Sequence, residues 1–168
     1  MVVAGVDVLS QRCAGQVAQA VMSHRLPLIT TYKAKGILDE RHELALGGAG
    51  LSPQADKVLL GTLAQADLIL LVGYDPIEMR AGWRDPWPPG TRVIEMAATS
   101  NTHYVHQASL SFVGHVGETL ASLLDRQPVS SAWTASELDA KRRSLADIFR
   151  ADEAWGPAAV VDTVRRTM

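Results

Sequence analysis

Cysteine is nearly absent from the sequence, with Cys13 as the only one among 168 residues. A single cysteine excludes an internal disulfide and a CxxC metal site, and it fits a reducing, cytoplasmic compartment. The motif HExxH does not occur, and His103, His106 and His115 do not have the helical spacing of a zinc site. We therefore expect this chain to bind no metal ion, and we interpret these histidines as surface or capping residues.

An excess of charge of one sign is also lacking, because 16 Lys and Arg residues stand against 18 Asp and Glu residues, for a net charge of -2. This balance predicts neither a nucleic-acid-binding groove nor contact with an anionic membrane. The apolar runs are too short to span a bilayer, and the first residues have no basic region of a signal peptide. With 47% hydrophobic residues, the chain is expected to form one globular domain, with or without a tail.

The glycine motifs that hold nucleotide phosphates are absent as well. After Gly5, which follows the first apolar run, the next glycine is Gly15, so neither GxGxxG nor the Walker A pattern occurs. We interpret the turn at Gly5 as a plain connection between a strand and a helix. The absence also argues against an unrelated NAD-dependent or sirtuin-like enzyme on a similar fold.

Short apolar runs alternate with segments of helical periodicity. The expected strands are residues 1–4, 28–30, 68–72, 92–96 and 110–113, with a further short strand near 44–46. The expected helices are residues 11–24 with Ser10 as N-cap, 52–65, a stripe over 116–124, 134–150 with a capping box, and a short helix from 156. Several strands are apolar at every position, which is typical of parallel strands covered by helices. The pattern predicts an α/β fold, a parallel sheet of five to six strands with helices on both faces.

The carboxyl ends of the expected strands carry glycines, hydroxyls and basic residues. Open parallel sheets bind ligands at this edge. The segment TTYKAKG suits phosphate oxygens and a solvated loop about equally, whereas GGAGLSP leads into a helix N-terminus and is more simply a tight turn. The candidate residues for binding a nucleotide are Gly5, Thr30, Gly50, Gly73 and Arg80.

The segment from residue 76 to 90 contains four prolines, which exclude a regular helix or a central strand. Trp83 and Trp87 in this segment form either a lid over a site or an anchor against another subunit, and we favour the subunit interface. Asp75 and Glu78 could form an acid–base pair, but Asp-Pro is a common turn starter. We therefore predict no catalytic residue here, and Arg80 is the better candidate for a ligand contact.

Three segments together resemble the central domain of thiamine-diphosphate-dependent enzymes of the acetolactate synthase and pyruvate oxidase group. They are LPLITTYKAKGILDERHELALGGAG, ADLILLVGYDPIEMR and SFVGHVGETLASLL. In that family a TT…KG segment precedes an acidic–His element and a glycine-rich turn, and this chain has the same order of elements. The resemblance covers residues 1–126 and implies a Rossmann-like sheet of six parallel strands.

The resemblance also implies a larger parent enzyme, a transferase or lyase, that makes or breaks carbon–carbon bonds of 2-keto acids with thiamine diphosphate and magnesium. The GDG segment that holds these groups in the family does not occur here. We expect residues 127–168 to be a linker and helices that lead toward a C-terminal diphosphate-binding domain outside this sequence. The chain alone is then catalytically inactive, and its partners are the other domains and subunits of a homo-oligomer.

Central domains of this family differ in their ligands, because some bind FAD, some bind ADP and some bind none. The flavin-binding members resemble one another in a glycine-rich first turn and in acidic residues near the fourth and fifth strands. Here residues 96–101 contain no aspartate, and His115 replaces an aspartate that often follows the glycine. A neutral imidazole cannot accept two hydrogen bonds as a carboxylate does. These differences favour a scaffold, with a module that binds FAD, ADP or coenzyme A as the alternative.

Overall fold

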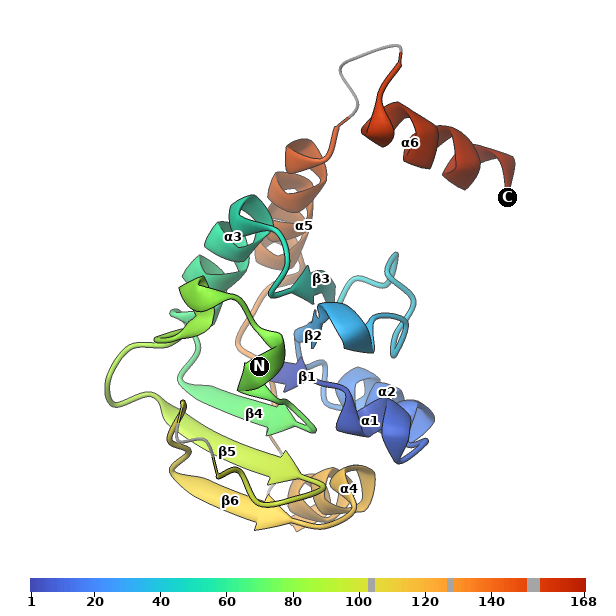
Figure 1. Cartoon of the computed structure of the whole chain (residues 1–168). Helices are drawn as coiled ribbons and strands as arrows, with labels where there is room; N and C mark the ends of the chain where they lie inside the picture. Colours follow the sequence, from blue (N-terminus) through green and yellow to red (C-terminus); the bar gives the residue numbers. More distant parts are fainter. Residues whose placement is uncertain (103–104, 127–128, 151–154) are drawn as a thin grey trace.

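A parallel sheet forms the centre of the structure, a computed structural model that describes residues 1–102, 105–126, 129–150 and 155–168. Its strands lie in the order β3-β2-β1-β4-β5-β6, and all neighbouring pairs are parallel (Figure 1). The strands are β1 (Val2–Ala4), β2 (Leu28–Thr31), β3 (Ala45–Ala49), β4 (Leu68–Val72), β5 (Arg92–Ala97) and β6 (Leu110–Val113). The predicted α/β fold with a six-stranded parallel sheet is confirmed.

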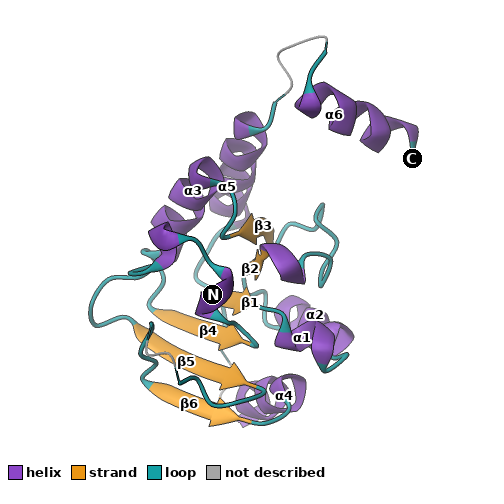
Figure 2. Ribbon diagram, viewed as in Figure 1, coloured by secondary structure: helices purple, strands orange, loops and turns teal. Residues whose placement is uncertain are grey.

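Helices cover both faces of the sheet, with α1, α2 and α4 on one side and α3 and α5 on the other (Figure 2). Their bounds are α1 (Asp7–Ser10), α2 (Ala14–Ser23), α3 (Pro53–Leu63), α4 (Val116–Arg126), α5 (Ala135–Ile148) and α6 (Pro157–Thr167). The described residues also form the short 3-10 helices η1 (Tyr32–Ala34), η2 (Pro76–Glu78) and η3 (Ala81–Trp83). Within the described ranges, no helix has both the length and the apolar character needed to cross a membrane.

Strand β4 shows why its sequence is apolar throughout. It lies in the middle of the sheet between β1 and β5, helices cover both faces of the sheet, and every residue after Leu68 is buried. A strand covered on both faces has no position that favours a polar side chain. The strand ends at Val72, and Gly73, with a φ of +63°, then turns the chain out of the sheet.

The predicted start of the first helix, with Ser10 as N-cap, is wrong. The chain forms the short helix α1 and then α2, because Arg12 adopts a left-handed φ of 57° that interrupts the helical backbone. Ser10 is not an N-cap, since its hydroxyl donates to the Asp7 carbonyl, and Cys13 takes the N-cap position of α2. The side chain of Gln11 binds Gly114 O at 3.1 Å and Val116 N at 2.8 Å. The break between the helices therefore ties them to the start of α4.

The two predicted N-caps of α3 and α5 are confirmed. Ser52 accepts a hydrogen bond from Ala55 N, with Pro53 in the first turn of α3. Thr134 and Glu137 form a reciprocal capping box at α5, in which Thr134 N donates to Glu137 Oε2 at 2.8 Å. The helix ends at Ile148 rather than at residue 150.

The capping box gives a first testable prediction. Replacing Thr134 by Ala removes the acceptor for Glu137 N, and we expect the free energy of unfolding to fall by about 1 kcal/mol. Thr134→Ser is the matched control, because it keeps the hydroxyl and should stay near the parent value. Urea denaturation measures both, and an unchanged midpoint for Thr134→Ala would show that α5 does not depend on this cap.

Candidate functional site

The candidate site lies where the turns after β1 and β4 meet at the carboxyl edge of the sheet. These strands are neighbours, but β1 continues toward β2 and β4 continues toward β5, so the crevice between them is the topological switch point of the sheet. Gly5 N donates to Val72 O at 2.9 Å, and Asp7 N donates to Gly73 O at 3.2 Å. The structure thus brings Gly5 and Gly73 together, as their positions after two strands predict.

Both glycines are required by the contact between these two turns. A Cβ atom on Gly5 would lie 2.3 Å from Gly73 O and 2.6 Å from the Cα of Tyr74. A Cβ atom on Gly73 would lie 2.6 Å from the Cβ of Asp7, and its positive φ is also unfavourable for other residues. The close approach of the two backbone turns is therefore a sufficient reason for glycine at both positions, and no bound ligand is needed to explain them.

Asp7 extends this contact to a third turn. Its Oδ2 atom accepts a hydrogen bond of 2.8 Å from Ala98 N, which follows β5. The side chain thus connects the turn after β1 with the turn after β5, across the end of β4. The sequence analysis did not identify Asp7, whose only local signal is its place after Gly5.

Thr30 and Gly50 lie on the β2–β3 side of the sheet, and both have partners within the domain. Thr30 is buried, and its hydroxyl donates to Gly47 O at 3.5 Å. Gly50 has a φ of +92° and donates its N–H to Asp56 Oδ1 at 2.7 Å. Since Asp56 is a buried carboxylate in the first turn of α3, it already occupies the position where the helix would attract an anion.

Arg80 follows η2 and is exposed, and its carbonyl accepts a hydrogen bond from Trp83 N at 2.9 Å. The five candidate residues therefore separate into three places. Gly5 and Gly73 meet at the switch point, Thr30 and Gly50 belong to the β2–β3 side, and Arg80 lies in the loop beyond η2.

The predicted interface role of Trp83 is wrong, because this side chain is only 1% exposed within its own domain. The segment after β4 folds back on the domain, and His106 Nε2 lies 2.7 Å from Trp83 O. The His106 ring stacks on Tyr74 at 5.7 Å and meets the edge of Trp87, which is half-buried, at 5.0 Å. A long-range contact thus makes the tryptophan part of the core, which the local sequence could not indicate.

Thr31, Tyr74 and Glu78 form a buried polar cluster, in which the Thr31 hydroxyl and the Tyr74 ring interact with the Glu78 carboxyl group. Trp83 is also buried, and neither its indole nitrogen nor the Tyr74 hydroxyl has a hydrogen-bond partner within the described ranges. Burial raises the pKa of Glu78, and the charges of Asp75 and Asp7 add to this, while the Thr31 hydroxyl and the Lys33 ammonium oppose it. Burial likewise raises the pKa of Tyr74. The cluster favours a neutral carboxyl group.

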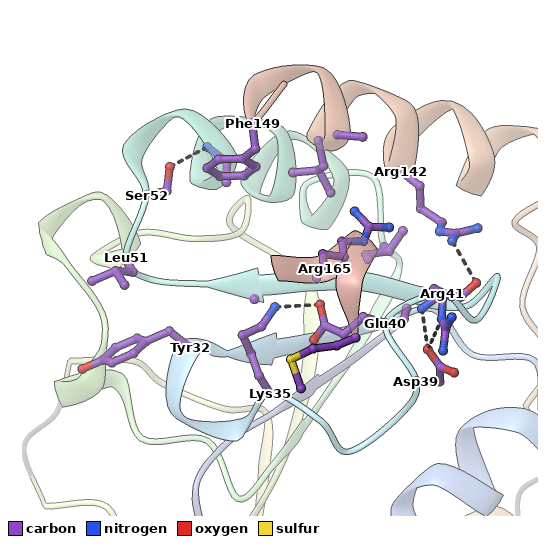
Figure 3. A pocket seen from close by; sticks show the side chains of 18 residues that line it. Tyr32, Lys35, Asp39, Glu40, Arg41, Leu51, Ser52, Arg142, Phe149 and Arg165 are labelled. Carbon is purple, nitrogen blue, oxygen red and sulfur yellow. Dashed lines mark hydrogen bonds and ion pairs between the residues drawn. The ribbon is translucent and has the colours of Figure 1, made fainter. Parts of the chain in front are cut away.

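A hollow beside β3, lined by residues of α3, α5 and α6, has a volume of about 1070 Å³. Figure 3 shows its lining side chains. Two of its cations are paired with carboxylates. Lys35 Nζ lies 2.6 Å from Glu40 Oε2, and Arg41 Nε lies 3.4 Å from Asp39 Oδ1. Lys35, a candidate for holding phosphate oxygens, is therefore paired with a carboxylate.

Nowhere in the described ranges do three or more His, Cys, Asp or Glu side chains gather closely enough to hold a metal ion together. Of the histidines considered for metal binding, His103 lies outside the described residues, and His115 Nδ1 accepts a hydrogen bond from Glu118 N at 3.3 Å.

The contact between the two turns gives a second prediction. Gly5→Ala places a methyl group against the Gly73 carbonyl, and we expect a loss of about 3 kcal/mol or more of unfolding free energy. Gly61→Ala is the control, because its Cβ atom would meet no atom within 4 Å in α3, and Ala favours a helix by about 1 kcal/mol over Gly. Urea denaturation compares them. Equal midpoints for Gly5→Ala and the parent would contradict the contact.

A third prediction follows from Glu78. Because its pKa is raised above the ordinary value of 4.5, the folded state binds more protons than the unfolded state above that pH. Stability should therefore fall as the pH rises from about 4.5 through the raised pKa, and Glu78→Gln should remove this part of the decline. Glu43→Gln, at an exposed ion pair with Arg25, should leave the decline in place. Urea denaturation from acid to neutral pH tests this, and the same decline in Glu78→Gln would be the contrary result.

Comparison with known proteins places this geometry in a family. Residues 1–123 match the profile of the family described as "Thiamine pyrophosphate enzyme, central domain". An acetolactate synthase large subunit of Corynebacterium glutamicum is 29% identical over 110 residues, which are 65% of this chain and 17% of the relative. A solved structure from Mycobacterium smegmatis, described as a candidate thiamin diphosphate-dependent enzyme, has the same fold, with a TM-score of 0.61. Its sequence is 19% identical, and the match covers 80% of this chain and 26% of that chain. The chain, which spans only a small part of the length of either relative, belongs to the family of thiamine pyrophosphate enzyme central domains.

Proposed function

We propose that this chain is the scaffold and interface domain of an acetolactate-synthase-like enzyme that uses thiamine diphosphate to make or break carbon–carbon bonds of 2-keto acids. The proposal rests on the family match together with one feature of the site, the closed contact between the turns at Gly5 and Gly73. In this role the domain positions its neighbours, while residues elsewhere in the parent enzyme carry the chemistry.

The backbone donors at the carboxyl edge of the sheet support the scaffold role. A phosphate group at a strand-to-helix turn needs N–H groups that point toward it. Here Gly5 N donates to Val72 O, Asp7 N donates to Gly73 O, and Gly50 N donates to Asp56. A ligand at this edge would have to replace bonds that the domain already makes.

The C-terminal part of the chain supports a place within a longer protein. Helix α5 packs on α3 and β3, and its Leu138 is buried. Helix α6 differs, because no residue of it is buried against the described part of the chain, and Val160, Val161 and Val164 form an exposed apolar face. We propose that residues 127–168 lead from the central domain at 1–126 toward a diphosphate-binding domain, with α6 packing on that domain.

The proposed parent is a cytoplasmic transferase or lyase that forms a homo-oligomer, and thiamine diphosphate and magnesium are held by its other domains. The 168-residue chain alone is then expected to convert no pyruvate when thiamine diphosphate and magnesium are supplied. A coupled assay for carbon dioxide release tests this, with a complete acetolactate synthase as positive control. Turnover above the rate without protein would contradict the scaffold proposal.

The alternative function is a module that binds FAD, ADP or coenzyme A. It is favoured by the position of Gly5 and Gly73 at the switch point, where open α/β sheets bind ligands. A ligand that binds only the folded state at a concentration of 100 times its Kd adds about 2.7 kcal/mol of stability. We expect no rise in melting temperature with any of the three ligands, and a saturable rise with one of them would support the alternative.

A further inference from the structure

Strand β6 forms one edge of the sheet and differs from every other strand in its exposure. All its residues are exposed, and Leu110, Phe112 and Val113 have 56%, 41% and 56% of their surfaces accessible. Helix α4 follows β6 in the chain, but it packs on α2, β4 and β5. An apolar strand therefore lies at the surface, and no strand of the described residues pairs with its outer edge (Figure 1).

The segment around β6 carries no formal charge. No Asp, Glu, Lys or Arg occurs between Glu95 and Glu118, although 20% of the chain consists of these residues. Exposed edge strands in soluble proteins are usually protected from pairing by charges, prolines or bulges. Strand β6 has no proline, and its register with β5 is regular. Its sequence contains none of the devices that prevent pairing with another strand.

The opposite edge of the sheet, formed by β3, is protected from pairing with another strand. Strand β3 contains Gly47 with a φ of 102°, and its pairing with β2 shifts register between Leu28 and Ile29. Helices α3 and α5 both pack against it. An irregular and partly covered strand is a poor template for a partner strand, so β6 is the edge that can be extended.

The backbone N–H and C=O groups at the outer edge of β6 indicate what kind of partner this strand can bind. Backbone groups of alternate residues in β6 face away from β5, and another strand satisfies such a row of N–H and C=O groups best. Pairing of β6 with β3 of another copy would leave open ends and produce a growing chain of molecules. Pairing of β6 with β6 closes after two copies, and the strand presents no like charges to its own copy.

We propose that β6 pairs antiparallel with β6 of a second copy across a two-fold axis, which joins two six-stranded sheets into one continuous sheet. The contact is short, because stable interfaces bury roughly 1,600 Å² in total and β6 has only four residues. The association of the chain by itself is therefore weak and depends on concentration. This contact requires nothing of the chemistry proposed above, so either proposal can fail without the other.

The first test is sedimentation of the complete chain at increasing concentration. We expect a reversible monomer–dimer equilibrium with a dissociation constant below about 1 mM. Phe112→Lys should raise this constant at least tenfold, because it places like charges opposite each other. Ile77→Lys is the matched control, because Ile77 is 64% exposed in η2, and it should leave the equilibrium unchanged. A monomer throughout this range, or equal loss in both variants, would overturn the proposal and point to another segment as the cover of β6.

Circular dichroism checks that the Phe112→Lys variant folds. Disulfide trapping tests the β6 contact independently of that variant. Single cysteines are placed in turn at Leu110, Ser111, Phe112 and Val113, while the native Cys13 is buried. Disulfides need Cβ atoms about 3.5–4.5 Å apart, so only the one or two positions nearest the axis should form covalent dimers under mild oxidation. Ile77→Cys should give none. Equal trapping at all positions, or at none, would contradict an antiparallel β6 pair.

Discussion

The close contact between the turns after β1 and β4 is the constraint on which the carboxyl edge of this domain depends. The two backbones approach so closely that a single Cβ atom at Gly5 would overlap the Gly73 carbonyl. Asp7 then connects the same region to the turn after β5. The N–H groups of Gly5 and Asp7, which lie at the edge where open α/β sheets bind ligands, hold neighbouring turns together here, and this supports the proposed scaffold role.

Much of the fold could be predicted from the sequence, because in most strands and helices the local pattern of apolar residues matches the pattern of burial. Strand β4 has the predicted bounds, since a strand covered on both faces is apolar at each position. The cap of α5 was also predictable, because Thr134 and Glu137 interact within one turn. The start of α2 was not, because the left-handed backbone at Arg12 is stabilised together with long-range bonds from Gln11 to the region of α4.

The candidate site was predicted less completely, for the same physical reason. Gly5 and Gly73 were identified because each follows a strand, and parallel strands place such residues at one edge. The bond from Asp7 to Ala98 spans 91 positions of sequence and has no local pattern. The cluster of Thr31, Tyr74 and Glu78 likewise forms only when the segment after β4 meets the end of β2. Contacts of this kind convert turn residues into core residues, and they decide whether an edge is open or closed.

The proposed scaffold role rests on the contact between turns at the carboxyl edge, and the proposed pairing of copies rests on the exposed strand β6. The central claim is that the backbone donors at the switch point are permanently used within the domain, and amide hydrogen exchange at single residues tests it most directly. The account predicts that the N–H groups of Gly5 and Asp7 exchange as slowly as those of the central strand β4, with no change when FAD or ADP is added. Exchange at the rate of an exposed loop, or protection that develops only with a nucleotide, would contradict it.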